Sequence, residues 1–369
     1  MDNNIEIELI KNINEKNKTD NFVISPIGIE ILLSLCSNGA EGETQNEILK
    51  YLNYNNIEEA NQKSKEILKQ LEKNEDILKT ANAILTKIRA KDKFIKIALD
   101  YDAKIEELKN YEHVNKWAKN KTKDKIVKII DSLSPNVLMI LLNALYLEAF
   151  WTIKFDKNNT YEKDFFNINE KKSIRTLTMF LRGELLNYYE NDFLQAVKLN
   201  YKSNSGKINA IIILPKENIN TFINDFNNEK YEKIIEELKK DKINVNLFLP
   251  KFKIDYTIDM SEILKDLGIR KAFTKEAEFK EISDRIPLHI GQILQKNYIN
   301  VNEEGTQAAS LTELEVILEC FRDKDPNAKD FIANKPFIFL LRNEDCPKGH
   351  DIIFFTKICK IENNNDNDY

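Results

Sequence analysis

The chain has 369 residues, of which 42% are hydrophobic and 31% are charged, and its formal net charge is -5. This length allows a large buried core, and the acidic balance gives no reason to expect a nucleic-acid partner, so we predict none. The 9 glycines and 8 prolines are scattered, and no linker divides the chain. We therefore expect one domain over residues 1–362 and a disordered polar tail over residues 363–369.

Helical patterns dominate the first part of the chain. Ser25 and Pro26 suit the start of a helix, because proline is favoured in the first helical turn. Apolar residues at helical spacing over residues 29–52, interrupted between Gly39 and Gly42, predict two helices that meet at a turn. Charged residues that alternate with isoleucine and leucine at three- and four-residue steps predict further helices over residues 58–73, 76–88, 113–131, 217–240 and 259–267.

Strand patterns mostly follow the helical ones. Runs rich in valine, isoleucine, leucine and phenylalanine predict strands over residues 137–146, 207–214, 243–253, 294–301, 336–341 and 352–361. Several of these runs are apolar at nearly every position, so we expect strands that are covered on both faces. Helices early in the chain with strands mostly after them indicate an α+β fold.

Motifs for catalysis, metals and cofactors are missing from the sequence. There is no GxSxG, HExxH, GxxxxGK[ST] or GxGxxG pattern, and the four cysteines have no metal-type spacing. The three histidines, at positions 113, 289 and 350, are far apart in sequence. Their spacing suggests neither a catalytic base beside a nucleophile nor a pair of metal ligands at His113, His289 or His350. We predict that the protein is not an enzyme, has no catalytic residue or metal site, and needs no cofactor.

The expected location follows from the start of the chain and from the cysteines. The first 21 residues mix acidic and amide side chains into every apolar stretch, unlike a secretory signal, and no apolar run is long enough to span a membrane. Cys36 and Cys359 lie in apolar runs typical of buried free thiols. We expect a cytoplasmic protein, or one released by an unconventional route, without a membrane partner.

The segment over residues 303–335 has no compact helical pattern but does have a period of two. One face of an extended chain here is uncharged, starts small and becomes aliphatic, with Thr306, Ala308, Ser310, Thr312, Leu314 and Val316. The other face carries the glutamates, with Gln307, Ala309, Leu311, Glu313, Glu315 and Ile317. This parity is what a strand entering between two others would need, and an ordinary surface loop has no need of it.

The stretch from Asn302 to Ser310, NEEGTQAAS, resembles the hinge of the reactive-centre loop of serpins. The resemblance extends over nearly the whole chain in a specific order of short motifs. They are NFVISP at 21–26, GAEGET at 39–44, NKW at 115–117 with Thr122 and Ile126, LNALY at 142–146, Trp151, LPKF at 249–252, LGI at 267–269 and PF at 336–337.

This resemblance implies the serpin fold, in which N-terminal helices pack on a large mixed central β-sheet with two smaller sheets and an exposed reactive-centre loop, here about residues 303–334. It also implies a monomeric protease inhibitor that acts as a suicide substrate. The target, a serine or papain-like cysteine endopeptidase, would form a covalent acyl complex while the cleaved loop inserts as a new central strand. The alternative is a non-inhibitory serpin that acts as a binding or chaperone protein.

Site residues are carried over from the family by position. The hinge comprises Glu303, Glu304, Gly305, Thr306, Gln307, Ala308, Ala309 and Ser310. Its small residues at Gly305, Thr306 and 308–310 are intact, which favours inhibition, although Leu311 departs from the usual small residue. The region where the sheet opens comprises Trp151, Lys251 as the partner of Glu303, Ser25, Asn143 and Gln295.

Two residues of the opening region depart from the family. Gly28 stands where serine is usual, and Gln295 stands where histidine is usual. Gln295 can still donate and accept hydrogen bonds, but it cannot titrate near neutral pH.

The bond to be cleaved is counted from the hinge. The family's usual seventeen residues from Glu303 end at Glu319, with Cys320 after the cut. Neighbouring choices are Leu318 or Phe321 for a chymotrypsin-like pocket and Arg322 for a trypsin-like one. With Glu319 before the cut, Leu318 would occupy the preceding subsite, which papain-like proteases read through an apolar pocket.

Overall fold

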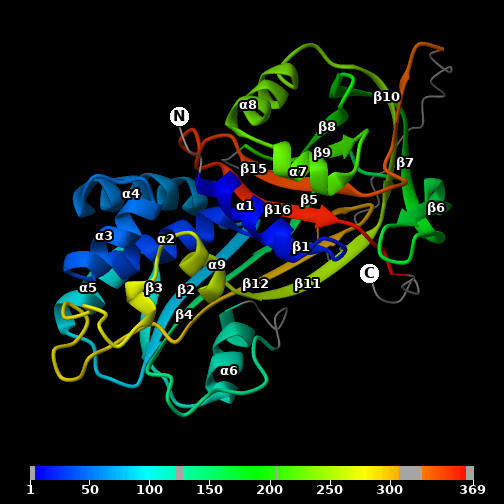
Figure 1. The fold of residues 1–369 in the computed structure, drawn as a ribbon. Coiled ribbons are helices and arrows are strands. Elements are labelled where there is room, and N and C mark those ends of the chain that lie inside the picture. Colours follow the sequence, from blue (N-terminus) through cyan, green and yellow to red (C-terminus); the bar gives the residue numbers. More distant parts are fainter. Residues whose placement is uncertain (1–4, 122–127, 204–206, 307–325, 363–369) are drawn as a thin grey trace.

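The computed structural model describes residues 5–121, 128–203, 207–306 and 326–362. Within them, the helices are α1 (Ile5–Lys16), α2 (Pro26–Ser37), α3 (Gly42–Tyr51), α4 (Ile57–Glu72), α5 (Asp92–Asp100), α6 (Tyr111–Lys121), α7 (Ile219–Asp225), α8 (Asn228–Glu237) and α9 (Ser261–Asp266). The helices of the first hundred residues gather at one end of two sheets, whereas the later helices α6, α7 and α8 lie elsewhere around them (Figure 1). Short 3-10 turns lie at Lys157–Asn159 and Lys271–Phe273.

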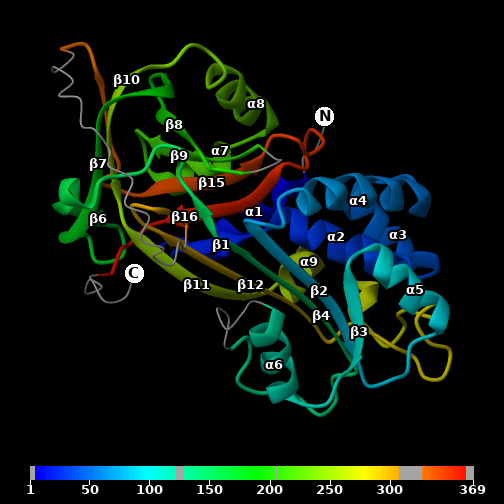
Figure 2. The same cartoon turned by 180° about the vertical axis from the view of Figure 1, so that it is seen from behind.

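Among the described residues, the central sheet has seven strands in the order β3-β2-β4-β12-β13-β5, and β11 pairs with the edge of β12 opposite to β4 and β13. Figure 2 shows β3, β2 and β4 side by side at one end of this sheet. Its strands are β2 (Leu78–Thr86), β3 (Ala103–Glu107), β4 (Met139–Leu147), β5 (Ala149–Phe150), β11 (Phe252–Asp259), β12 (Gln292–Val301) and β13 (Gly305–Thr306).

In the same described part of the chain, the second sheet has nine strands in the order β1-β16-β15-β9-β8-β7-β10-β14, with β6 paired to β7. Its long strand β7 pairs with β6 and β10 over most of its length and with β8 near its end, so it links the two smaller sheets that were predicted. The strands are β1 (Phe22–Ile24), β6 (Tyr161–Asn167), β7 (Lys172–Glu190), β8 (Leu194–Asn200), β9 (Ile208–Pro215), β10 (Ile243–Pro250), β14 (Lys329–Ile332), β15 (Phe337–Asn343) and β16 (Ile352–Ile358).

Both faces of the central sheet are covered. Leu141 and Leu145 of β4 belong to the main core, on the side of α1 and α2, whereas Leu142 and Ala144 belong to a second core under α6. Figure 1 accordingly shows α2 and α6 on opposite sides of the sheet. Every residue of β4 is buried, which explains an apolar run without alternation. The α+β fold class is confirmed.

The helix predicted over residues 76–88 is wrong. This segment is strand β2, which pairs with β4 on one edge and with β3 on the other. Its residues alternate between the two cores, since Ala81 and Ala83 lie under α6 while Leu78 and Ile84 face the main core. Alanine and leucine favour helices, but pairing on both edges overrides that preference.

Three predicted elements end or divide earlier than expected. The helix over 217–240 is two helices, α7 and α8, because Asn227 caps the second by accepting from the amide of Lys230 at 2.9 Å. The helix over 113–131 is not helical beyond residue 127, where the side chain of Asn115 binds the backbone of residues 129 and 130. The strand over 243–253 is interrupted at Lys251, between β10 and β11.

Candidate functional site

The hinge begins inside the central sheet. One edge of β12 pairs with β4 and then, at Val301, with Thr306 of β13, and β13 pairs in turn with β5, which follows β4 directly. Two residues of a third strand therefore already separate β12 from β5 at this end. A Cβ atom on Gly305 would lie 1.9 Å from the carbonyl oxygen of Ala149, so only glycine fits there.

Thr306 is fully buried at the point where the described hinge ends. Its hydroxyl shares a 2.6 Å hydrogen bond with the hydroxyl of Tyr201. Burial raises the pKa of Tyr201, so this hydroxyl stays protonated. The Tyr201 ring stacks on Trp151, with ring centroids 4.3 Å apart. The buried hydroxyl of Thr306 thus has a hydrogen-bond partner beside the stacked rings of Tyr201 and Trp151.

A tight turn connects β12 to β13. The side chain of Asn302 accepts from the amides of Glu304 and Gly305 at 3.0 and 3.2 Å. Trp151 makes two hydrogen bonds to this turn. Its indole nitrogen donates to the carbonyl of Asn302 and its backbone amide donates to the carbonyl of Glu304, both at 2.9 Å. The family resemblance predicts Trp151 beneath the hinge; in the structure it contacts this turn, and its role in the hinge stays a prediction.

Glu303 and Glu304 of the turn form ion pairs that differ in how deeply they are buried. Lys251 Nζ lies 3.3 Å from Glu303 Oε2, and the two side chains are 9% and 6% exposed. This pair is buried, so the small contribution typical of exposed ion pairs does not apply to it. Glu304 is 31% exposed and lies 3.2 Å from Lys154 and 3.6 Å from Lys157.

A second group of predicted residues meets in the middle of the central sheet. The side-chain amide of Gln295 donates to the carbonyl of Ser25 and to Asn143 Oδ1, both at 2.8 Å. Two further side chains, which were not predicted from the sequence, join this group: Asn143 donates to Asn82 Oδ1 at 2.8 Å, and Asn297 donates to Gln295 Oε1 at 2.9 Å. Asn82 lies directly opposite Asn143 in the strand register, which the sequence does not reveal.

The remaining site residues lie outside the described residues. They are Gln307, Ala308, Ala309 and Ser310 of the hinge and Leu318, Glu319, Cys320, Phe321 and Arg322 around the cleavage position, and they stay predictions. The described ends of the predicted loop are strands, β13 and β14, and β14 pairs in parallel with β10. The connection between strands is therefore shorter than the predicted range of 303–334.

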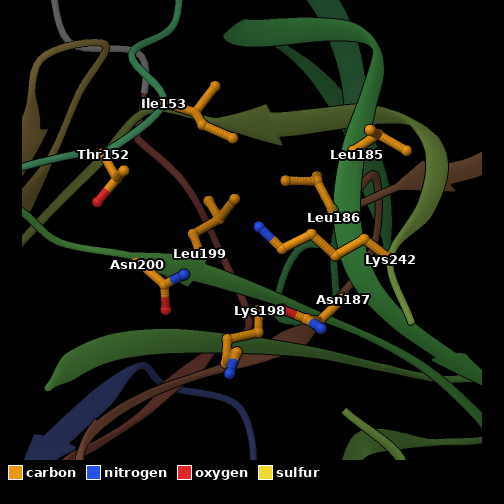
Figure 3. Close-up of a pocket in the computed structure, with 9 residues that line it drawn as sticks. All are labelled: Thr152, Ile153, Leu185, Leu186, Asn187, Lys198, Leu199, Asn200 and Lys242. Atoms are coloured by element: carbon orange, nitrogen blue, oxygen red, sulfur yellow. The ribbon is translucent and has the colours of Figure 1, made fainter. Parts of the chain in front are cut away.

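A small cavity lies near the hinge, between the end of β7, the strand β8 and residues 152–153 (Figure 3). Its volume is about 40 Å³, and the Lys242 side chain extends across it toward Leu199. This volume holds a water molecule or a methyl group and is well below that of a small-molecule site.

Two features typical of metal and membrane proteins are absent from the part of the chain that the structure describes. Its residues include no group of three or more histidine, cysteine, aspartate or glutamate side chains arranged to hold a metal ion. None of the described helices combines the length and the apolar character needed to cross a membrane.

A separate polar cluster lies beneath α1. It brings together Glu6 of α1, Glu30 of α2 and Asp351, which precedes β16 and pairs with Arg342. Burial raises the pKa of Glu6 well above its usual range, and the neighbouring Asp351 and Glu30 raise it further. The folded protein therefore holds a proton on Glu6 at pH values where the unfolded chain has released it.

Replacing Glu6 with glutamine should stabilise the protein in a pH-dependent way. The pKa of Glu6 is higher in the folded state than in the unfolded state, where it is about 4.5. The free energy of unfolding of the wild type therefore falls as the pH rises from about 4.5 toward the pKa of the folded state. Each unit of difference between the two pKa values corresponds to about 1.4 kcal/mol. We expect equal thermal midpoints for E6Q and wild type near pH 4.5 and a midpoint higher by about 2 °C or more for E6Q at pH 7.5. Differential scanning fluorimetry measures both.

The matched control is Glu15→Gln on the same helix. Hydrogen bonds from Lys18 and Asn224 lower the pKa of Glu15, so its removal should give no gain at high pH. A gain for E15Q equal to that for E6Q would contradict the assignment to the buried cluster.

Comparisons with known proteins agree with the order of motifs. The family model described as Serpin (serine protease inhibitor) matches residues 2–361. Serpin A3-8 of Bos taurus is 30% identical, over 95% of this chain and 85% of that protein. The thermophilic serpin tengpin in its native state is 30% identical, with a TM-score of 0.84 over 97% of this chain and 92% of tengpin. Human thyroxine-binding globulin, solved with thyroxine, has the same fold at 22% identity, with a TM-score of 0.85 over 97% of this chain and 96% of that chain.

Proposed function

This chain belongs to the serpin family, whose members generally inhibit proteases, and from that premise we propose that it inhibits a protease as a suicide substrate. The observation that carries the proposal is the placement of β13, which begins the hinge within the central sheet between β12 and β5. A segment that continues from Thr306 has its entry point already formed.

The proposed chemistry belongs to the target protease. Its serine or cysteine nucleophile attacks the carbonyl carbon of the residue before the cut, which is Glu319 by the count from Glu303. The amine of Cys320 leaves with the proton supplied by the protease, and the rest of the loop stays attached to the enzyme as an acyl ester or thioester. This chain supplies the bond and the motion, and no catalytic group.

The motion is insertion of the loop between β4 and β12. These strands are paired directly over seven residue pairs, from Gln292 with Ile140 to Tyr298 with Tyr146. An inserted strand would move them from about 4.8 Å apart to about 10 Å. In the inserted strand, with Thr306 inward, residues 308, 310, 312, 314 and 316 would face the same side, toward the main core.

The energy available for this motion is large. Burying the uncharged face at roughly 1–2 kcal/mol per side chain, together with new strand hydrogen bonds, gives on the order of 10 kcal/mol. This rivals the net stability of a typical domain, which is about 5–15 kcal/mol. Insertion that precedes hydrolysis of the acyl bond would hold the protease in a covalent complex.

The test is incubation with trypsin-like, chymotrypsin-like and papain-like proteases, followed by denaturing electrophoresis. We expect a complex that survives denaturation with at least one of them and a released C-terminal fragment that begins at Cys320 by mass spectrometry. Cleavage without any complex would contradict inhibition. A different N-terminus would contradict the count from Glu303 but not the mechanism.

Heating separates inhibition from the alternative of a binding or chaperone protein. Loop-cleaved inhibitor should melt far above the intact form, because its extra strand completes the central sheet. Identical melting of the two forms would favour the alternative.

We further propose that the chain is a monomer whose partner is this protease, without nucleic-acid or membrane partners. The cytoplasmic location stays a prediction.

A further inference from the structure

An aromatic side chain lies exposed on the turn between β7 and β8. Phe193 is 65% exposed, and among the large apolar side chains of the described residues only Leu99, at 69%, is more exposed. Within that part of the chain, Phe193 belongs to neither hydrophobic core. The fold therefore gains little from this ring, most of which stays in contact with water.

Hydrogen bonds fix the backbone of this turn. Asn191 Oδ1 accepts from the amides of Phe193 and Leu194 at 2.8 and 3.0 Å. The side-chain nitrogen of Asn191 donates to the Tyr189 hydroxyl at 2.9 Å. The carbonyl of Phe193 accepts from the amide of Lys216, directly after β9, at 2.8 Å. An aromatic ring on a backbone held in this way loses little conformational entropy when a partner binds it.

The turn lies against the start of β14, the strand that follows the predicted cleavage position. Glu190 Oε2, at the end of β7, lies 3.6 Å from Lys329 Nζ. Gln195 of β8 donates to the backbone carbonyl of Asp330 at 3.1 Å. These contacts reach β14 from both sides of the turn, since Glu190 precedes Phe193 in the chain and Gln195 follows it. The exposed ring is thus fixed beside the strand that leads away from the predicted cut.

This position is within reach of a protease at the predicted cut. Ten positions separate Glu319 from Lys329, and a chain of that length spans at most about 35 Å. A protease domain of about 220 residues is itself roughly 45 Å across. Its surface outside the active site therefore reaches the turn between β7 and β8. Because Lys329 follows the cut, that surface lies on the side of the active site that binds residues after the cut.

We propose that Phe193 is a docking residue for the target protease, which receives the ring in an apolar recess beside the subsites for residues after the cut. The proposal rests on the proposed function, because it requires that a protease attacks the loop. The contact acts on the encounter, before the peptide bond is cleaved. Insertion of the loop then carries the acylated protease away from the turn. The contact therefore contributes to the rate of attack and not to the stability of the final complex.

The test compares Phe193→Ala with the wild type against trypsin, chymotrypsin and papain. Two quantities are measured, the second-order rate constant for loss of the intact chain and the share of the lost chain that is trapped as covalent complex. For the protease that consumes the wild type fastest, F193A should lower the rate constant by about fivefold or more, the loss typical of a truncated aromatic anchor. The trapped share should stay unchanged.

The matched control is Leu99→Ala, which removes a similarly exposed apolar side chain from α5 and should leave the rate constant unchanged. Phe193→Tyr keeps the ring and should retain the wild-type rate constant. Equal rate constants for F193A and wild type would overturn the docking role, and so would a loss of the same size in L99A. A smaller trapped share at an unchanged rate constant would also overturn it, because Phe193 would then act on insertion.

Failure of the proposed function gives a different result. A wild type that is cleaved without any complex would contradict inhibition. The rate constant for loss of the intact chain is measured in either case, since it counts cleaved and trapped chains together. The comparison of F193A with wild type therefore decides the docking role whether or not the protease is trapped.

Discussion

Under the proposed mechanism, an arginine in place of Thr306 should convert the protein from an inhibitor into a substrate of the target protease. Thr306 is fully buried between Val301 and Ala149, with its hydroxyl on Tyr201, and an inserted loop keeps this residue inside the sheet. In the intact protein an arginine here can leave the sheet if the two residues of β13 unpair, but an inserted loop must bury its charge without a partner at a cost of several kcal/mol, which slows insertion while hydrolysis of the acyl bond continues. We expect the yield of covalent complex on denaturing gels to fall by about tenfold or more, with cleaved protein in its place.

The control for this variant is Gln307→Arg, at the next position along the chain. Its predicted parity points away from the core, so an arginine there should leave complex formation nearly unchanged. Equal trapping by T306R and wild type would contradict insertion with Thr306 inward.

A lysine in place of Glu303 should destabilise the native state and promote self-association. Lys251 and Glu303 are each less than one tenth exposed, so E303K removes the carboxylate beside Lys251 and places two cations together. Disruption of a buried ion pair typically costs about 3–5 kcal/mol. We expect a lower thermal midpoint in scanning fluorimetry and oligomers in size-exclusion chromatography after mild heating, because the turn that anchors β13 is released.

Two further variants separate the buried pair from charge in general. Glu304→Lys reverses a charge on the same turn, but Glu304 is partly exposed and its ion pairs with Lys154 and Lys157 contribute only about 0–1 kcal/mol each. The exchanged pair K251E with E303K should recover part of the loss. If E304K lowered the thermal midpoint as much as E303K, burial of the ion pair would not be the cause of the lost stability.

The sequence predicted elements best where local pattern and tertiary role coincide. The buried strand β4 and the helices α2 to α4 follow directly from apolar runs and helical spacing. Helix α1 was not predicted, because it buries polar residues such as Asn14 against distant partners, among them Asn224. The strand β7 was missed for a related reason, since its 19 residues are stabilised by three different strands rather than by a simple alternation.

Part of the candidate site was predicted from the positions of residues in the sequence, and the structure added the residues that join them in space. Trp151, Lys251 and Glu303 meet at the hinge, and Ser25, Asn143 and Gln295 meet in the middle of the sheet. Tyr201 and Asn297 were missed, because they join these groups only through strand register and ring stacking. Departures from the family pattern were visible at Gly28 and Gln295, but their common dependence on Asn143 appears only in three dimensions.

The turn between β12 and β13 bears on how the chain folds. Val301 and Thr306 pair across a turn of a few residues, whereas Gln295 pairs with Asn143 across a separation of 152 positions. Closing the short turn is entropically easier, and a hairpin that extended beyond Val301 and Thr306 during folding would compete with β4 for the same edge of β12. Strand β4 is synthesised before β12 and pairs with β2 from Leu78 with Leu147 to Thr86 with Met139. We therefore expect β4 already paired with β2 to favour the native pairing of β12 over an extended hairpin.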